Sequence, residues 1–224
     1  IVFGDWSSDV CSSDLFFLML APHQPHPPLN PEETPSGYLE SITESISWSP
    51  NVPKNNPRTV ESIRCYYAMV KNIDDNVGAL MRYLKELGIL EDTIVVFTSD
   101  HGEMHGSHGR LHKMVPYREA VDVPLCFLWK GKVQENQEND SIFTPMDYLP
   151  TLCSLVGIEV PGCLDGKDLS GSVLNNSLDD REEILLMNYT RHWNEFYSET
   201  PETAADWQCW PEWRGVRKIG RAHV

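Results

Sequence analysis

Apolar and polar positions divide the chain into a few segments with a clear period. Residues 16–20, "FFLML", form a continuous apolar run that ends in the proline-rich "APHQPHPPLNP", which predicts a buried strand followed by a loop. Over 58–87, apolar residues recur at alternating steps of three and four, which predicts a core-facing helix closed by Gly88. A coiled coil is the weaker alternative, since the stripe stops and runs into a strand. The stripe consists of Ile63, Tyr66, Val70, Ile73, Val77, Leu80, Leu84 and Leu87.

Two further apolar runs and a short helix follow. "TIVVFTS" (93–99) and "VPLCFLW" (123–129) are apolar throughout, as strands of a parallel sheet covered on both faces would be. "MDYLPTLCSLVG" (146–157) predicts a helix that Gly157 closes. This order predicts an α/β fold, a layered sandwich with a mostly parallel central sheet flanked by helices, incomplete at both ends. Residues 30–57 carry five prolines and predict a surface excursion, and no element is predicted beyond about 180.

The two ends of the chain are related at the level of their codons. One legal set of codons for 9–14, "DVCSSD", is the reverse complement of one legal set for 219–224, "IGRAHV". An adapter ligated to both ends of a DNA fragment and read through as coding sequence would produce this relation. We therefore predict that 1–15 and 219–224 are adapter-derived and set them aside from fold reasoning. Residues 16–218 are then expected to be an internal piece of a longer protein.

Charge and cysteine content narrow the class of function. The net charge of −15 makes nucleic acid and membrane partners unfavourable, and an anionic substrate would need a metal or locally concentrated positive charge. No apolar run reaches the roughly 20 residues of a spanning helix. The six cysteines form no CxxC pair, which argues against a disulfide framework and a zinc site. Cys126 and Cys153 lie in apolar segments and are predicted to be small core residues.

Two polar clusters follow predicted strands, where ligands bind in an open parallel sheet. They are "PHQPHPP" after 16–20 and "SDHGEMHGSHGRLHK" (99–113) after 93–99. On its own, Asp-His-Gly also fits a plain turn in which Asp100 caps and Gly102 supplies a positive φ. Convergence of the two clusters favours a site instead. Asp100 suits a hard cation, and Lys113 with His26 suits an oxyanion.

These segments resemble the sulfatase family. "TIVVFTSDHGEMHGSHGRLHKMVPYREAVDVPL" (93–125) resembles its signature of a strand ending in Asp-His-Gly, a Gly-x-His-Gly, a lysine and Pro-Tyr-x-Glu-Ala-Val-x-Val-Pro-Leu. "FFLMLAPHQPHPPL" is similar to its Pro-His-x-Pro strand and loop, and "EWRGVR" to the entry of its C-terminal sheet. The resemblance implies an alkaline-phosphatase-like fold, with 16–180 as the C-terminal part of the catalytic α/β domain and 181–218 as the start of a C-terminal subdomain.

The resemblance also implies roles for individual residues. Asp100 and His101 match two ligands of a calcium ion, and Lys113 matches the lysine that bridges sulfate and the catalytic aldehyde hydrate. His26, favoured over His23 by its distance from the Phe-Phe pair, matches the histidine that contacts sulfate and protonates the leaving oxygen. The implied reaction is hydrolysis of a sulfate ester of a small molecule or glycan. The implied location is periplasmic, secreted or lysosomal.

Departures from the family pattern limit what this chain does alone. The family's formylglycine nucleophile arises from the cysteine of Cys-x-Pro-x-Arg, and no cysteine of this chain has that context. The paired aspartates that open the metal site are absent, and Asp122 stands where arginine is frequent. We expect this chain by itself to be inactive. Alternatives are a phosphodiesterase or phosphonate monoester hydrolase of the same superfold and a non-catalytic binding protein, in which Asp100, His101 or Lys113 would be expected to be lost.

Overall fold

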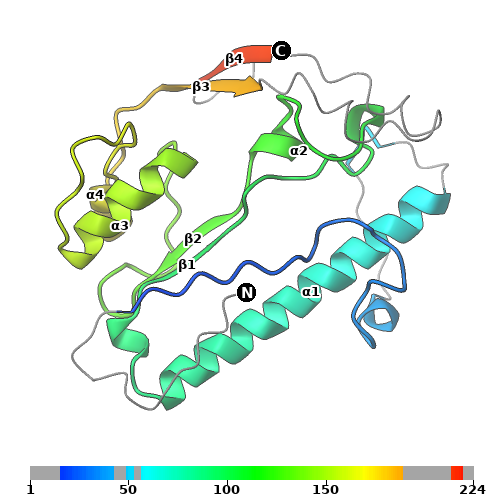
Figure 1. Ribbon diagram of the computed structural model, residues 1–224, viewed down its shortest axis with the longest axis horizontal. Helices are drawn as coiled ribbons and strands as arrows, with labels where there is room; N and C mark the ends of the chain where they lie inside the picture. The colour runs from blue at the N-terminus through cyan, green and yellow to red at the C-terminus, as the bar shows by residue number, and fades with distance from the viewer. Residues whose placement is uncertain (1–15, 43–48, 53–56, 189–212, 219–224) are drawn as a thin grey trace. The chain divides into compact units, whose positions relative to one another are not determined.

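A computed structural model describes residues 16–42, 49–52, 57–188 and 213–218 (Figure 1). The chain divides into two compact units, and each is described by itself. The first comprises Ile1–Trp48 and Lys54–Leu80, and the second comprises Ser49–Pro53 and Met81–Val224. The segments 1–15 and 219–224, predicted to be adapter-derived, lie outside the described residues. Among the helices of the described residues, none is long and apolar enough to cross a membrane.

The first unit contains the short 3-10 helix η1 (Leu39–Ser41) and most of the long helix α1 (Pro57–Glu86). Side chains of α1 hold the segment around η1. Lys71 Nζ donates to Ser41 Oγ at 3.0 Å, Asp75 accepts from the Tyr38 hydroxyl at 2.9 Å, and Arg64 donates to the Ile42 carbonyl at 3.4 Å. Part of the proline-rich excursion is thus attached to one face of the helix.

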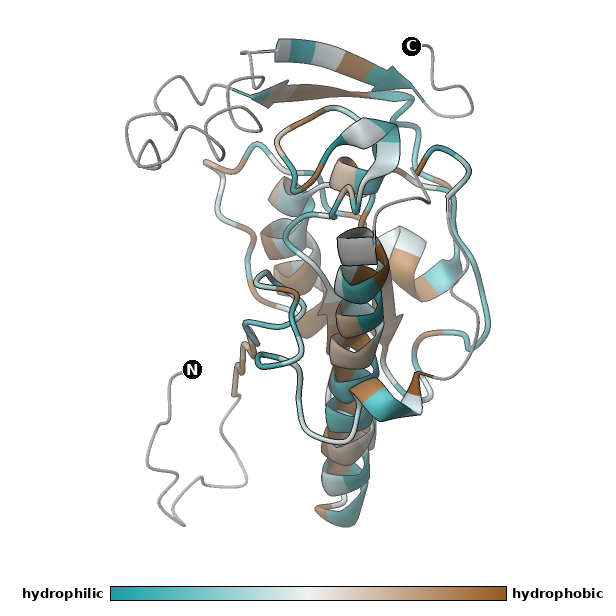
Figure 2. Cartoon of the chain, turned by 90° about the vertical axis from the view of Figure 1, so that its right-hand side faces the viewer, coloured by the Kyte–Doolittle hydropathy of each residue, from teal (hydrophilic) through white to brown (hydrophobic). Residues whose placement is uncertain are grey.

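Helix α1 confirms the predicted helix, but its buried face differs from the predicted stripe. Gly88 closes it with φ +73°, and its N–H donates to the Lys85 carbonyl at 3.0 Å. Apolar and polar residues alternate along it (Figure 2). Of the stripe, only Ile63 and Leu84 are buried, and Val70 is 39% exposed. The stripe follows large apolar side chains, so it omits the small residues Cys65 and Ala68 that the structure buries. The other buried positions are Cys65, Ala68 and Met69.

The prediction of a buried strand over residues 16–20 is wrong for this structure. The segment forms no strand, and all five residues are exposed, with Phe17 at 80% and Met19 at 74%. A strand needs neighbouring strands to take its backbone N–H and C=O groups, and no described segment pairs with this one. An apolar run therefore shows that a segment can be buried, but it does not show that the neighbouring strands needed to bury it are present.

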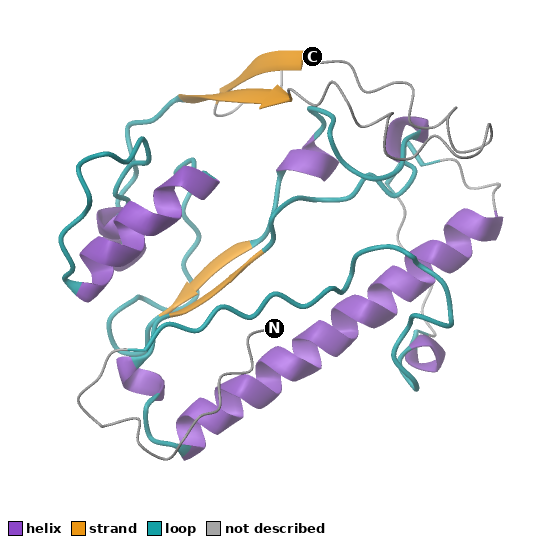
Figure 3. Ribbon diagram, viewed as in Figure 1, coloured by secondary structure: helices purple, strands orange, loops and turns teal. Residues whose placement is uncertain are grey.

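The second unit holds two antiparallel strand pairs (Figure 3). Strands β1 (Val95–Thr98) and β2 (Leu125–Leu128) confirm two predicted strands, with the 3-10 helix η2 (Leu90–Asp92) before β1. Their register places Thr98 opposite Leu125 and Val95 opposite Leu128, so a parallel sheet is not confirmed among the described strands. Residues 99–124 connect the two strands and contain the 3-10 helix η3 (Ser107–Gly109) and the four-residue α2 (Arg118–Val121).

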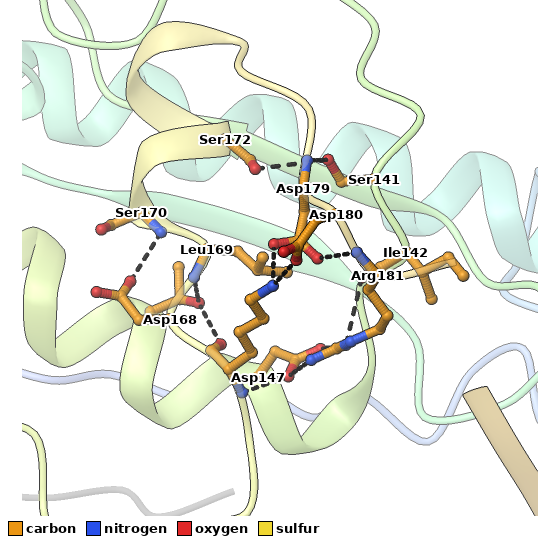
Figure 4. Close-up of polar contacts among 12 residues, drawn as sticks. Ser141, Ile142, Asp147, Asp168, Leu169, Ser170, Ser172, Asp179, Asp180 and Arg181 are labelled. Carbon is orange, nitrogen blue, oxygen red and sulfur yellow. Dashed lines mark hydrogen bonds and ion pairs between the residues drawn. The ribbon is translucent and has the colours of Figure 1, made fainter. Parts of the chain in front are cut away.

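Helix α3 (Tyr148–Val156) confirms the predicted helix, with Gly157 at φ +74° as its cap. The 3-10 helix η4 (Pro145–Asp147) precedes it, and α4 (Ser170–Asn175) follows. The fully buried Asp147 carboxylate joins these segments, because it accepts hydrogen bonds from Thr144 and from the Lys167 N–H. It also accepts from the Arg181 guanidinium, as Figure 4 shows.

The cysteine predictions have a mixed outcome. Cys126 is exposed and Cys153 is half-buried, so their assignment to the core is wrong, whereas Cys65 is fully buried. All four cysteines within the described ranges, Cys163 included, are free thiols. Cys126 is exposed because the β1–β2 pair has a face that no other described strand covers.

A second antiparallel pair was not predicted from the apolar pattern, although "EWRGVR", which resembles the entry of the family's C-terminal sheet, overlaps its second strand. It consists of β3 (Glu183–Asn188) and β4 (Trp213–Lys218), with Glu183 opposite Lys218 and Asn188 opposite Trp213. Along both strands exposed and half-buried residues alternate, as expected for a sheet with one covered face. Asn188 at the end of β3 is buried.

Candidate active site

The end of β1 presents Asp100 and His101 side by side. Asp100 Oδ1 accepts from the His101 backbone N–H at 3.0 Å, and the Ser99 hydroxyl donates to the His101 carbonyl at 2.8 Å. These short-range bonds form a turn in which the Asp100 side chain stays 85% exposed. Asp100 Oδ2 and His101 Nε2 lie 3.5 Å apart, so a carboxylate oxygen and an imidazole nitrogen converge on one point.

Gly102 allows the turn to lie close to α2 because it has no side chain. Its N–H donates to the Ala120 carbonyl at 2.9 Å, and a Cβ there would lie 2.0 Å from the carbonyl oxygen of Glu119. The positive φ that the plain-turn alternative assigned to Gly102 is not found, because this glycine does not lie in the left-handed region. The requirement for glycine comes from the close approach of the turn to α2, which fixes Asp100 and His101 relative to that helix.

The loop between His101 and Lys113 is closed on itself. Met104 N–H donates to the His112 carbonyl and Gly106 N–H to the Arg110 carbonyl, each at 2.8 Å. Glu103 Oε1 accepts from the backbone N–H groups of His112 and His105. Burial, opposed by the nearby Glu103 carboxylate, lowers the pKa of His105. These hydrogen bonds therefore fix the conformation of the loop that leads from His101 to Lys113.

A small apolar core anchors the loop to α2. Met104, Val115 and Ala120 are buried together, with Tyr117 packed against them. Lys113 lies two residues before Val115 and is half-buried. Asp100, His101 and Lys113 all line one open cavity of about 2010 Å³. The cavity is wide, with a lining that extends to α4, β3 and β4, and three of the four predicted site residues are among its lining residues.

Asp100 and His101 fit a cation. His101 Nδ1 lies 2.8 Å from the Gly102 carbonyl oxygen, which only accepts, so Nδ1 carries a proton, and in the neutral ring Nε2 then has the lone pair that a cation needs. A backbone carbonyl holding the second ring nitrogen is the usual support of a metal-binding histidine. Within the described ranges no group of three or more His, Cys, Asp or Glu side chains forms a metal cluster. Asp100 and His101 are thus a pair of side chains that could supply two of a cation's ligands.

His26, the fourth predicted site residue, lies in the first unit. Its backbone N–H donates to the His23 carbonyl at 3.0 Å, its Nδ1 lies 2.7 Å from the Pro27 carbonyl oxygen, and its ring is 5.0 Å from that of His23. The two histidines therefore share one tight turn. The choice of His26 over His23, and its role, stay a prediction.

Sequence reasoning missed a polar cluster beside the loop. The Asn51 amide donates to His108 Nε2 at 3.0 Å and to Glu119 Oε1 at 3.2 Å, and the His108 ring stacks on Tyr117 at 4.2 Å. Burial alone would raise the pKa of Glu119, but its backbone N–H, Asn51, His108 and Ser107 outweigh burial and lower this pKa. The sequence carried no signal for Asn51, because its contacts are 57 and 68 residues away.

A second missed cluster surrounds Asp122, whose departure from the family pattern the sequence did indicate. Asp122 accepts a bidentate pair from the Arg217 guanidinium and a 2.9 Å bond from Arg118 Nε. It therefore connects the end of α2 to β4. All three side chains line the same cavity as Lys113.

Comparison with protein families gives a match to one model. The model described as Sulfatase matches residues 11–158. The Ulvan-active sulfatase of Formosa agariphila is 36% identical over 75% of this chain and 33% of its own length. The Endo-4-O-sulfatase of Bacteroides thetaiotaomicron is 32% identical over 69% of this chain and 32% of its own length. The chain thus spans about a third of the length of these curated relatives.

Solved structures resemble the chain as well. A Bacteroides fragilis protein assigned to the sulfatases is 28% identical with a TM-score of 0.64, covering 70% of this chain and 36% of its own. A protein bound to its substrate D-glucosamine-2-N,6-O-disulfate is 29% identical with a TM-score of 0.58, covering 60% and 28%. The phosphonate monoester hydrolase of Agrobacterium radiobacter is 25% identical with a TM-score of 0.56, covering 67% and 29%.

Proposed function

Because the chain belongs to the sulfatase family, we propose that the protein containing it hydrolyses sulfate esters on an alkaline-phosphatase-like fold with a mostly parallel central sheet. The observation that carries the proposal is the placement of Asp100 Oδ2 and His101 Nε2 within 3.5 Å of each other, beside a cavity that Lys113 also lines. A paired acid and imidazole suit a cation, and an ammonium group suits the sulfate that the cation would share.

Asp100 and His101 would hold a calcium ion. The His101 tautomer fixed by the Gly102 carbonyl leaves Nε2 free to coordinate, and the exposed Asp100 carboxylate supplies oxygen. Calcium takes about six to eight ligands, so further oxygens would come from other parts of the protein and from water. When bound, the cation would offset the charge that develops on the sulfate oxygens.

Lys113 and His26 would act on the substrate itself. The Lys113 ammonium would bind a sulfate oxygen and stabilise the added charge of the transition state. His26 would donate the proton that the leaving alcohol oxygen needs, as a general acid. The nucleophile of this reaction, a formylglycine, would come from a part of the full-length protein outside these 224 residues, so the chain alone is expected to bind anions without turnover.

The substrate class we propose is a sulfated glycan or a small sulfate ester. Its support is that one relative is named for ulvan and that one structural neighbour binds a disulfated glucosamine. We also propose that the protein acts in the periplasm, in a lysosome or after secretion, which rests on the resemblance alone.

Substitution of Asp100 and Lys113, the two residues with proposed roles in cation and sulfate binding, tests the function. In the full-length protein, Asp100→Ala should abolish calcium-dependent hydrolysis of an aryl sulfate and calcium binding by calorimetry. Lys113→Ala should lower kcat by about 10²–10³-fold, as loss of one charge-stabilising donor does, with the fold unchanged by circular dichroism. Asp92→Ala and Lys132→Ala remove the same groups from exposed positions and should keep wild-type rates. Wild-type rates in Asp100→Ala and Lys113→Ala would refute the site.

Hydrolysis of phosphonate monoesters is a second candidate, favoured by the similarity to the Agrobacterium radiobacter enzyme. The same cation and ammonium group would serve a phosphonate oxyanion. Measuring kcat/KM for matched aryl sulfate and aryl phosphonate esters decides between them. A higher kcat/KM for the phosphonate ester would make phosphonate monoester hydrolysis, and not sulfate ester hydrolysis, the main activity.

A further inference from the structure

Met114, directly after Lys113, has an unfavourable backbone conformation. Its φ is +77°, in the left-handed region that glycine adopts freely and a methionine does not. Such a conformation persists only when surrounding contacts hold it, and residues of this kind concentrate at functional sites. The structure shows those contacts.

Two donors from the β3–β4 hairpin converge on the carbonyl oxygen of Met114. The Trp213 indole Nε1–H donates to it at 2.9 Å, and the Asn188 amide donates at 3.4 Å. Trp213 and Asn188 are cross-strand partners, so the register of the hairpin places both donors together. They are 99 and 74 residues from Met114 in sequence. The β3–β4 pair therefore binds the loop although it belongs to a distant part of the sequence.

The residue on the other side of Lys113 is fixed in the same way. His112 is also left-handed, with φ +66°, and its N–H donates to Glu103 while its carbonyl accepts from Met104. Lys113 is therefore bracketed by two left-handed residues, each held by hydrogen bonds from elsewhere. The His112 carbonyl lies in the peptide plane directly before the Lys113 Cα, and the Met114 carbonyl lies in the plane after Met114. The backbone is therefore held by hydrogen bonds on both sides of Lys113, which restrains the direction in which its side chain leaves the chain.

We propose that Trp213 is a positioning residue for Lys113. Its indole N–H, assisted by the Asn188 amide, holds the Met114 carbonyl and so directs the lysine into the cavity that Asp100 and His101 line. This inference rests on the proposed role of Lys113 in binding sulfate. If Trp213 positions Lys113, the β3–β4 pair helps to hold the active site in place although it lies far along the chain.

Trp213→Phe removes the indole N–H and keeps an aromatic ring. In the full-length protein we expect kcat for an aryl sulfate to fall at least tenfold, with a smaller change in KM. The matched control is Trp129→Phe, since the Trp129 indole also donates to a carbonyl, that of Glu91, at 3.1 Å. Trp129 follows β2 at the end that pairs with Val95, which is the end away from Thr98 and the site. The kcat of Trp129→Phe should therefore stay at the wild-type value.

A double-mutant cycle separates positioning from general stability. If Trp213 acts through Lys113, then Lys113→Ala with Trp213→Phe should be no slower than Lys113→Ala alone. Additive losses, or a wild-type kcat in Trp213→Phe, would overturn the inference while leaving the sulfatase proposal intact. Full activity in Lys113→Ala would overturn both this inference and the proposed role of Lys113. Should Trp213→Phe fail to fold, Asn188→Ala removes the other donor, and the same cycle with Lys113→Ala gives the same decision.

Discussion

At the scale of single residues, Gly102 holds the site by having no side chain. A Cβ at this position would meet the Glu119 carbonyl oxygen at 2.0 Å, and the nearest atoms are all backbone atoms of Glu119 and Ala120, which cannot rotate away as a side chain can. Gly102→Ala should therefore destabilise the chain by about 1–3 kcal/mol, the usual cost of overpacking. It should also weaken calcium binding, because the turn that carries Asp100 and His101 must move. Urea unfolding and calorimetry measure the two effects.

The control for this substitution is Gly162, where a Cβ would meet nothing within 4 Å and φ is not in the left-handed region. Gly162→Ala should change the free energy of unfolding by no more than about 0.5 kcal/mol. Equal unfolding midpoints for the two variants would show that the turn tolerates a side chain at Gly102.

At the scale of elements, Asp147 joins η4 and α3 to the segments that precede α4 and β3. Asp147→Asn keeps the shape of the side chain but leaves the Arg181 guanidinium without its carboxylate. Breaking a buried pair from one side costs about 3–5 kcal/mol, so the urea midpoint at pH 7 should fall by a corresponding amount. Asp165→Asn, at an exposed aspartate, is the control and should leave the midpoint unchanged.

The same carboxylate predicts a pH dependence. Burial alone would raise the pKa of Asp147, but hydrogen bonds from Arg181, Lys167 and Thr144 outweigh it and lower this pKa. The stabilisation is therefore complete above the ordinary pKa of aspartate, about 3.9, and is lost as the pH falls through the lowered value. The difference in free energy of unfolding between wild type and Asp147→Asn should narrow as the pH drops from 5 to about 2. A constant difference would contradict this account.

The elements that sequence predicted well are those specified locally. Apolar periodicity and the closing glycines Gly88 and Gly157 fixed α1 and α3 to within a few residues, since a helix makes its hydrogen bonds within itself. Strand direction, the exposure of 16–20 and the existence of β3 depend on partners distant in sequence. The site divides in the same way: Asp100 and Lys113 follow from a strand and its loop, whereas the bond from Trp213 to Met114 spans 99 residues.

At the scale of the whole molecule, negative charge and exposed apolar surface act against each other. The net charge is −15 at pH 7, and the sequence pI is about 4.8. Leu185 and Val216 are cross-strand partners on the β3–β4 pair and are 59% and 64% exposed. Mutual repulsion keeps such chains apart at neutral pH, and that repulsion vanishes near the pI. We therefore expect the chain to self-associate as the pH approaches 4.8.

Leu185→Glu combined with Val216→Lys tests which surface associates, because it replaces an apolar pair by an ion pair and leaves the net charge unchanged. Light scattering should show that association rises less than in wild type as the pH falls from 7 to 5, with a similar unfolding midpoint. Exchanging Glu183 and Lys218, which face each other on the same strands, preserves both charge and apolar area and should match wild type. If the apolar pair contributes, only the first variant stays monomeric. Identical curves for all three proteins would assign association to loss of charge alone.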